Sequence, residues 1–164
     1  MIRLIVLDVD GCLTDGRIVY GESGEEIKAF NVKDGLAIKG WMRLGYEVAI
    51  ITGRRSGIVK RRAEELGILH LYQGVKDKEK RLKMLCSDLG VALEEVATIG
   101  DDLNDLRMLQ RSGISFAPAD ASAYITATVD RVLARKGGDA AVREMIEELI
   151  RGNGQEEAFL AQWQ

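Results

Sequence analysis

Short apolar runs alternate along the chain with longer stretches in which apolar and polar residues recur at helical spacing. The first run covers Ile2 to Leu7, and others of strand length follow at 48–51, 68–72, 96–99 and 114–116. The segments between them show the amphipathic pattern of surface helices. This alternation is typical of βαβ units and predicts an α/β fold with a parallel sheet flanked by helices.

Capping residues mark the ends of several predicted helices. Ser56 and Gly67 delimit one helix, and Asp34 is expected to cap another that ends near Gly45. The remaining predicted elements are helices at 77–89, 103–110 and 139–150 and an edge strand at 129–133. Together these elements fill most of the chain.

Two segments depart from the α/β alternation. Residues 17–30 contain two β-prone stretches around a polar turn at 21–24, which predicts a small β-hairpin. The tail, residues 155–164, carries three large apolar side chains, which is unusual for a disordered end. It either packs on the chain's own surface or reaches a neighbouring subunit. We expect one domain over residues 1–164, because this length suits a single hydrophobic core.

Composition and charge exclude several classes of protein. The apolar share of 46% and charged share of 30% are those of a globular protein, and a net charge of -3 offers no basic surface for nucleic acid. Asp8 interrupts an N-terminal run too short for a signal peptide or membrane span. We therefore expect a cytoplasmic protein that binds neither nucleic acid nor membranes. Cys12 and Cys86 are predicted to be free thiols, and His70, the only histidine, to pack locally.

Polar residues with catalytic potential follow the predicted strands. Ligand sites of open α/β sheets lie at the carboxyl ends of the strands, so these residues are expected to meet at one edge. None of the motifs decides the function alone, because acidic pairs often cap turns and charged runs often form solvated helix faces. The candidate residues are Asp8, Asp10, Thr52, Gly53, Lys78, Asp101, Asp102 and Asp105.

The two-residue spacing of Asp8 and Asp10 lets one carboxylate attack a substrate while the other transfers protons. A carboxylate and a phosphate dianion repel each other, so this chemistry requires a metal ion. Asp101 and Asp102 are the expected source of that site. Carboxylate oxygens without histidine or thiolate favour Mg²⁺ over Zn²⁺.

Phosphoryl oxygens need donors and positive charge, and three residues are predicted to supply them. Thr52 offers a hydroxyl, Gly53 a backbone N–H group at a helix entrance, and Lys78 an ammonium group. The combined pattern predicts an enzyme that acts on a phosphate ester.

The segments DVDGCLTDG, ITGR and GDDLND, together with Lys78, resemble the ordered motifs of the haloacid dehalogenase superfamily over nearly the whole chain. Residues 8–39 and 134–147 are more specifically similar to the family of 3-deoxy-D-manno-octulosonate 8-phosphate phosphatases. The resemblance implies a Rossmann-like fold and hydrolysis of that ester to the free sugar acid and phosphate, in lipopolysaccharide precursor synthesis.

The resemblance also implies a role for each acidic residue. Asp8 would be the nucleophile that forms an aspartyl-phosphate, and Asp10 the general acid and then the general base. Mg²⁺ would be held by Asp8, the backbone carbonyl of Asp10 and Asp101, with Asp102 and Asp105 supporting these ligands.

Larger members of the superfamily carry a cap domain over the active site, for which this chain has no room. Only the hairpin and one helix fit between Asp10 and Thr52, and only a helix and a strand between Thr52 and Lys78. We expect a neighbouring subunit to cover the site, and the resemblance implies a homotetramer formed through the hairpin.

A substrate with a carboxylate as well as a phosphate needs further cationic contacts. Surface ion pairs are the alternative interpretation of the arginines among the candidates. The candidates are Arg54, Arg62, Gly137, Gly138 and Arg143. Two other functions remain open: a phosphatase for another sugar-acid phosphate, such as a nine-carbon acid 9-phosphate, and a non-catalytic oligomerising domain of the same fold.

Overall fold

A computed structural model describes all 164 residues of the protein. Six strands form one sheet in the order β5-β4-β1-β6-β7-β8, and every pairing between them is parallel. The predicted α/β class with a parallel sheet is confirmed. In chain order the strands are β1 (Leu4–Leu7), β4 (Glu47–Ile51), β5 (His70–Tyr72), β6 (Val96–Ile99), β7 (Ile114–Ala117) and β8 (Arg131–Val132).

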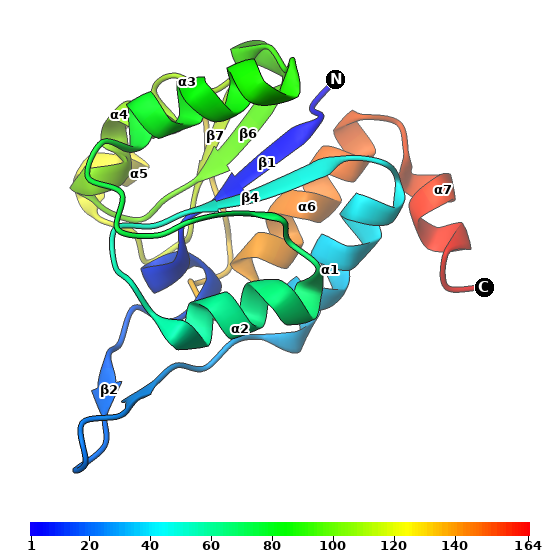
Figure 1. Cartoon of the computed structure of the whole chain (residues 1–164). Coiled ribbons are helices and arrows are strands. Elements are labelled where there is room, and N and C mark those ends of the chain that lie inside the picture. Colours follow the sequence, from blue (N-terminus) through cyan, green and yellow to red (C-terminus); the bar gives the residue numbers. More distant parts are fainter.

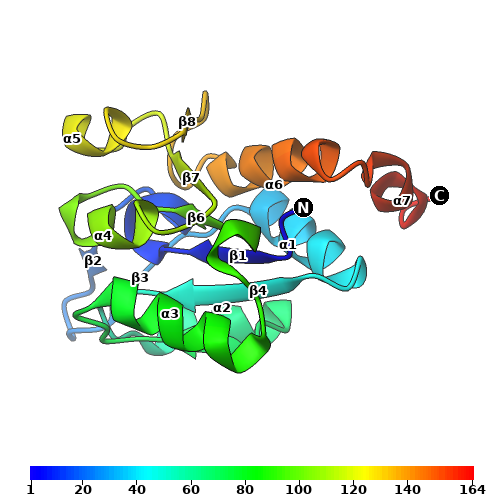
Figure 2. The same ribbon diagram turned by 90° about the horizontal axis from the view of Figure 1, so that it is seen from above.

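Helices cover both faces of this sheet (Figures 1 and 2). On one face lie α1 (Val32–Arg43), α2 (Gly57–Leu66) and α6 (Ala141–Gly152), and on the other α3 (Lys78–Leu89) and α4 (Leu106–Leu109). The short helix α5 (Ala123–Thr126) packs through Ile125 against β7. No helix of the protein combines the length and the apolarity that crossing a bilayer requires.

The central strand β1 shows why its sequence is apolar without interruption. Ile5 and Leu7 pack into the core under α1, α2 and α6, whereas Leu4 and Val6 pack into the core under α3 and α4. Side chains of a strand alternate between the two faces, and here both faces are covered. All four residues of β1 are consequently buried.

The predicted helix boundaries at Ser56 and Gly67 are confirmed, but the cap of α1 is not the residue that we predicted. The side chain of Asn31 accepts a hydrogen bond from the backbone N–H of Lys33 and caps α1. Asp34 lies one turn further on, where it is buried and accepts a hydrogen bond from the backbone N–H of Arg143 at 2.8 Å. Asp34 therefore holds the start of α6 rather than the start of its own helix.

Other features of the structure also differ from the predictions, among them β8, which covers only Arg131–Val132 of the expected strand at 129–133. The helix expected at 103–110 is split into a 3-10 turn, Leu103–Asp105, and the single turn of α4, because the side chain of Asp105 binds the preceding backbone. The sequence did not indicate α5, which is only one turn long. The first strand begins at Leu4 rather than Ile2. The backbone N–H and carbonyl of Ile2 are hydrogen-bonded to the side chain of Asn153 instead of to a neighbouring strand.

The predicted hairpin is confirmed as the antiparallel pair β2 (Val19–Tyr20) and β3 (Glu26–Ile27), which projects from the body of the protein (Figure 1). The tail forms α7 (Glu156–Ala161) and packs on α1 of its own chain. Phe159 is buried against Gly40, and the side-chain amide of Gln162 donates to the Gly40 carbonyl at 3.1 Å. Of the three apolar side chains of the tail, Phe159 packs on the chain itself, whereas Leu160 and Trp163 are about half exposed, and a contact of these two with a neighbouring subunit stays a prediction.

Candidate active site

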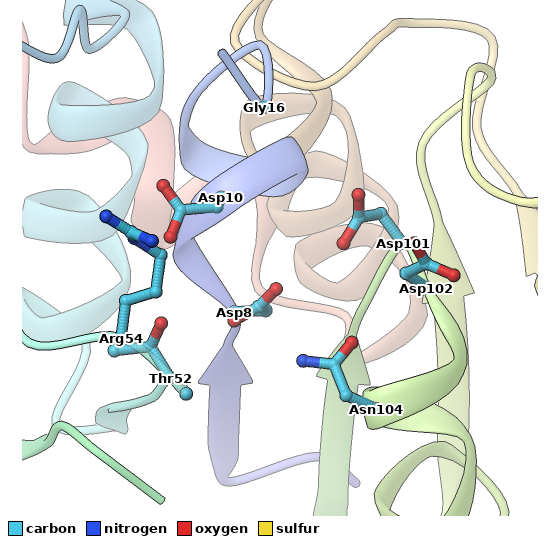
Figure 3. Close-up of a pocket in the computed structure, with 9 residues that line it drawn as sticks. Asp8, Asp10, Gly16, Thr52, Arg54, Asp101, Asp102 and Asn104 are labelled. Carbon is cyan, nitrogen blue, oxygen red and sulfur yellow. The ribbon is translucent and has the colours of Figure 1, made fainter. Parts of the chain in front are cut away.

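The strand order reverses direction at β1, from which the chain first builds toward β5 and later toward β8. Such switch points open a crevice beyond the carboxyl ends of the strands. A pocket of about 250 Å³ lies there (Figure 3), and no apolar side chain lines it. Its lining residues are Asp8, Asp10, Gly16, Thr52, Gly53, Arg54, Asp101, Asp102 and Asn104.

Asp8 leaves the end of β1 and is bound from below by a buried lysine. The Lys78 ammonium lies 2.8 Å from Asp8 Oδ1 and 2.5 Å from Asp105 Oδ1, and its side chain is only 2% exposed. Burial lowers the pKa of this ammonium, but the charges of Asp8 and Asp105 outweigh that effect and raise it. Lys78 is therefore a fixed positive charge beneath the pocket.

Asp105 connects Lys78 to the loop that follows β6. Its second carboxylate oxygen accepts hydrogen bonds from the backbone N–H groups of Asp101 at 3.0 Å and Asp102 at 3.4 Å. The side chain is completely buried. Asp105 thus orients both Lys78 and the acidic loop without lining the pocket itself.

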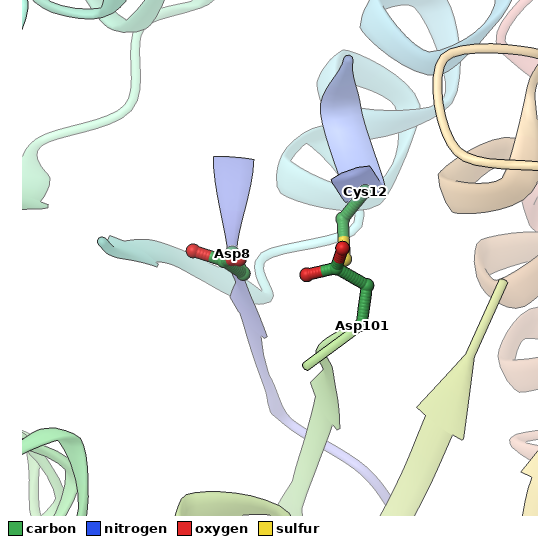
Figure 4. Close-up of side chains that lie close together, drawn as sticks. All are labelled: Asp8, Cys12 and Asp101. Carbon is green, nitrogen blue, oxygen red and sulfur yellow. The ribbon is translucent and has the colours of Figure 1, made fainter. Parts of the chain in front are cut away.

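Asp8 and Asp101 form an acidic pair across the pocket, and Cys12 lies beside them (Figure 4). One ligand atom of each of the three residues lies within 4.8 Å of the others. Burial, followed by the charge of Asp105, raises the pKa of Asp8 to about 6. Burial and the charges of Asp8, Asp105 and Asp102 raise the pKa of Asp101 to about 7.

The negative charge that Asp8 and Asp101 concentrate in the pocket favours the binding of a cation. Burial also raises the pKa of the Cys12 thiol well above its usual value, so this residue stays protonated and is a poor ligand. Carboxylate oxygens then remain as the donors, which suits a hard ion such as Mg²⁺. Gly11 leaves the room for this pair, since a Cβ there would lie 1.9 Å from Asp101 Oδ2.

Asp10 lies at the mouth of the pocket in an irregular turn, where Gly11 adopts a left-handed backbone with φ of 91°. Its carboxylate contacts a residue that the sequence analysis did not single out. The ammonium group of Lys28, at the base of the hairpin, lies 2.5 Å from Asp10 Oδ1. Lys28 is isolated in the sequence among hairpin residues, so no motif pointed to it.

Thr52 and Gly53 follow β4 and line the pocket. Thr52 lies on the side opposite Asp101 and Asp102 (Figure 3). Thr52 is buried, and its backbone N–H donates to the Tyr72 carbonyl at 3.0 Å. Asn104 also lines the pocket, although the sequence analysis passed over it. Asp102 is exposed at the rim, where its side chain accepts from the backbone N–H of Leu103.

Among the candidate substrate-binding residues, only Arg54 lines the pocket of this chain. The Arg62 guanidinium lies over the Phe30 ring at 5.6 Å, and Arg143 pairs with Glu147. Both arginines flank the buried Asp34 and lie outside the pocket.

Gly137 and Gly138 have a different position. They form a turn that packs backbone to backbone against the loop after β1, and the Gly138 N–H donates to the Cys12 carbonyl at 3.1 Å. A Cβ at Gly137 would lie 1.8 Å from the Gly11 carbonyl oxygen. In this chain the two glycines support the loop that carries Asp8 and Asp10.

Comparison with known proteins gives consistent matches. Residues 67–146 match the family described as haloacid dehalogenase-like hydrolase. The chain is 46% identical to the 3-deoxy-D-manno-octulosonate 8-phosphate phosphatase KdsC of Salmonella typhi, over 93% of this chain and 81% of that protein.

Solved structures agree with this match. The phosphatase of the same name from Moraxella catarrhalis, in complex with magnesium ion, phosphate ion and KDO, is 42% identical with a TM-score of 0.96, over 99% of this chain and 94% of that one. The cobalt-bound enzyme of Haemophilus influenzae is 43% identical with a TM-score of 0.90, over 93% and 90%.

Proposed function

The chain belongs to the haloacid dehalogenase-like hydrolases and, among them, to the 3-deoxy-D-manno-octulosonate 8-phosphate phosphatases, and from this premise we propose that it hydrolyses that ester with Mg²⁺. The products are the free sugar acid and phosphate. The observation that carries the proposal is the position of Asp8, bound by Lys78 at 2.8 Å and facing Asp101 in a pocket without apolar lining.

The proposed reaction has two steps. First, an Asp8 carboxylate oxygen bonds to phosphorus while the bond from phosphorus to the sugar oxygen breaks, and Asp10 donates a proton to the departing oxygen. Asp10 then takes a proton from water, whose oxygen bonds to phosphorus as the bond to Asp8 breaks. Both aspartates return to their starting state, and phosphate leaves.

Asp8 and Asp101 are the proposed side-chain ligands of Mg²⁺, together with the backbone carbonyl of Asp10. Their closeness and their raised pKa values support this assignment, because a divalent cation relieves the repulsion between them. When bound, the ion supplies the positive charge that lets a carboxylate approach a phosphate dianion. We assign Asp102, at the rim, and Asp105, beneath the loop, to the support of these ligands.

The phosphoryl group is proposed to lie between Thr52 and Lys78. The Lys78 ammonium already lies beside the nucleophile, so it offsets the charge that develops on the phosphoryl oxygens. The Thr52 hydroxyl and the Gly53 N–H are the proposed hydrogen-bond donors on the other side. Positioning and charge stabilisation of this kind supply most of the catalysis in phosphoryl transfer.

The pocket has no cap within the chain, since only the hairpin, α1 and β4 lie between Asp10 and Thr52, and only α2 and β5 between Thr52 and Lys78. We propose that a neighbouring subunit covers it in a homotetramer built on the hairpin. Exposed apolar side chains support a contact there, with Val19 48%, Tyr20 64% and Ile27 51% exposed. Arg62, Arg143 and the glycine pair remain candidates for the sugar acid in such an assembly.

A panel of sugar phosphates tests the proposal. It includes 3-deoxy-D-manno-octulosonate 8-phosphate and a nine-carbon sugar-acid 9-phosphate, each assayed for phosphate release with Mg²⁺, with EDTA, and with Asp8→Asn. We expect Mg²⁺-dependent turnover of the eight-carbon ester, reduced by at least about 1,000-fold in the variant that lacks the nucleophile.

Other outcomes of the panel identify the alternatives. Preference for the nine-carbon ester would keep the chemistry and replace the substrate. Binding of Mg²⁺ with no turnover of any ester would indicate the non-catalytic oligomerising domain.

We place the protein in the cytoplasm, and its two buried free cysteines support this, because thiols remain reduced there.

A further inference from the structure

Lys28 follows β3 at the base of the projecting hairpin (Figure 1). The hairpin strands are largely exposed, yet the Lys28 side chain is completely covered, with 0% of its surface accessible. Removing an ammonium group from water costs several kcal/mol unless it is paired. Lys28 must therefore have partners, and these partners indicate its role.

The two partners of Lys28 are carboxylates. Its ammonium lies 2.5 Å from Asp10 Oδ1 and 3.4 Å from Glu26 Oε1. Glu26 in turn lies 3.2 Å from the Arg54 guanidinium, which lines the pocket. Alternating charges thus join the hairpin base to Asp10 and Arg54, two residues that line the pocket.

The contact with Lys28 is the one hydrogen bond that the Asp10 carboxylate makes. The backbone of the turn fixes the position of the Asp10 Cα and Cβ atoms, but it does not fix the side-chain torsion angles that orient the carboxylate. A general acid works only when its proton lies within hydrogen-bond reach of the departing oxygen. In this chain the group that can hold the carboxylate in one orientation is Lys28.

We propose that Lys28 is a positioning residue for Asp10 and that Glu26 holds Lys28 in place. This inference rests on the proposed phosphatase function and adds a residue to its site. Lys28 binds Oδ1 of the Asp10 carboxyl group and so aims the other oxygen, which carries the proton, at the oxygen that leaves phosphorus. Lys28 itself touches neither substrate nor metal. The hairpin accordingly contributes to proton transfer as well as to assembly.

Proton donation matters more for some esters than for others, and this difference provides the test. A sugar alkoxide is a poor leaving group and needs a proton from Asp10 as its bond to phosphorus breaks. The p-nitrophenolate ion is stable without a proton. Loss of Lys28 should therefore slow the first ester selectively, whereas general damage to the fold slows both equally.

The experiment compares kcat/KM for 3-deoxy-D-manno-octulosonate 8-phosphate and p-nitrophenyl phosphate in wild-type protein and in Lys28→Met. We expect a loss of roughly 10- to 100-fold for the sugar ester, a part of the effect of general acid catalysis, and less than about 3-fold for the nitrophenyl ester. The ratio of the two values does not depend on the fraction of active protein, so partial unfolding does not distort it.

Lys28→Arg should restore much of the ratio, because it returns a cation to the same two carboxylates. Glu26→Gln leaves Lys28 in place and should also lower the ratio of kcat/KM for the sugar ester to that for the nitrophenyl ester, but less strongly than Lys28→Met does. This variant replaces Lys28→Met in the test if Lys28→Met does not fold. Lys39→Met is the matched control, because Lys39 is exposed on α1 and forms no ion pair. Its ratio should equal that of the wild type.

Equal losses for the two esters in Lys28→Met, or no loss for either, would overturn the inference while leaving the phosphatase function intact. Wild-type protein without activity on either ester would instead overturn the proposed function. The two failures are therefore distinguishable within one set of assays.

Discussion

Two acidic residues of the pocket, Asp8 and Asp101, can bind either protons or the proposed cation. Asp101 has a pKa raised to about 7 and Asp8 one raised to about 6, so protons occupy these carboxylates increasingly as the pH falls below 7. Mg²⁺ must displace those protons in order to bind. Its affinity should therefore rise with pH and level off above the higher pKa.

We expect the dissociation constant of Mg²⁺ to increase roughly 10- to 100-fold as the pH falls from 7.5 to 5.5, because protons compete with the ion at two carboxylates with these pKa values. Calorimetric titration in two buffers with different ionisation enthalpies measures both the affinity and the protons released. Asp101→Asn should release fewer protons. An affinity that is independent of pH over this range would contradict the metal assignment.

Asp34 offers a separate test at the residue scale, because it does not line the pocket. Burial raises its pKa from 3.8 to about 6, and one of its oxygens has no hydrogen-bond partner. The folded state therefore holds the proton more tightly than the unfolded state. This contribution to stability is complete below the unfolded pKa and is lost as the pH rises through about 6.

Asp34→Asn stays neutral throughout that range. The free energy of unfolding of this variant should therefore improve relative to wild type by about 1 kcal/mol between pH 5 and 7.5. Urea unfolding at the two pH values measures the difference, and the other titrating groups cancel in the comparison. A difference that does not change with pH would show that Asp34 remains ionised when buried.

The candidate site residues after the strands could be predicted because each stands in a short local pattern. Asp8 and Thr52 each follow an apolar strand, and the fold then brings those strands side by side. Lys28 could not be predicted in this way, since its partner Asp10 is 18 residues away and only the turn of the hairpin brings them together. Asp34 was misassigned for a similar reason, because its partner on α6 is 109 residues away.

At the scale of elements, the turn of Gly137 and Gly138 shows how α6 affects the catalytic loop. A Cβ at Gly137 would lie 1.8 Å from the carbonyl oxygen of Gly11 and 2.9 Å from that of Thr14. These are backbone atoms, so the loop itself must move. We expect Gly137→Ala to reduce kcat about 100-fold, the typical cost of displacing catalytic groups by about 1 Å.

Steady-state kinetics separate this role from direct substrate binding, which would raise KM and preserve kcat. Gly152→Ala is the matched control, because Gly152 ends the same helix and a Cβ there would meet no atom within 4 Å. It should leave the kinetics unchanged. A Gly137→Ala enzyme with normal kcat would show that the turn does not support the loop.

The boundaries of α2 and α3 were predictable because single residues supply their caps. Ser56 and Asp77 begin α2 and α3, and glycines with left-handed backbone end both helices. The segment 103–110 followed helical spacing, yet Asp105 divides it by turning its carboxylate toward Lys78 and the loop. Tertiary contacts of a buried charge thus outweighed the local helical pattern.

For the whole molecule, the projecting hairpin leads to a prediction about assembly. Val19 and Ile27 are register partners, and both are about half exposed. Changing both to Glu places like charges in any contact between hairpins, so the double variant should sediment as a monomer at micromolar concentration. Its turnover of p-nitrophenyl phosphate should persist, because the catalytic residues belong to one chain, whereas KM for the sugar ester should rise.

Leu69→Glu provides the control, since Leu69 is an apolar residue that is 88% exposed outside the hairpin. This variant should keep the assembly state of the wild type. Wild-type protein that sediments as a monomer at the same concentration would contradict the proposed role of the hairpin.

The central place of β1 in the sheet also determines when activity can arise during synthesis. The strand that leads to Asp8 is synthesised before both of its neighbours in the sheet, because it pairs with residues 47–50 on one side and 96–99 on the other. Its second edge stays open until residues 96–99 have been made. Such long-range pairing slows folding and leaves an apolar edge that a chaperone can protect. A nascent chain therefore displays the proposed nucleophile, Asp8, before the sheet that positions it is complete.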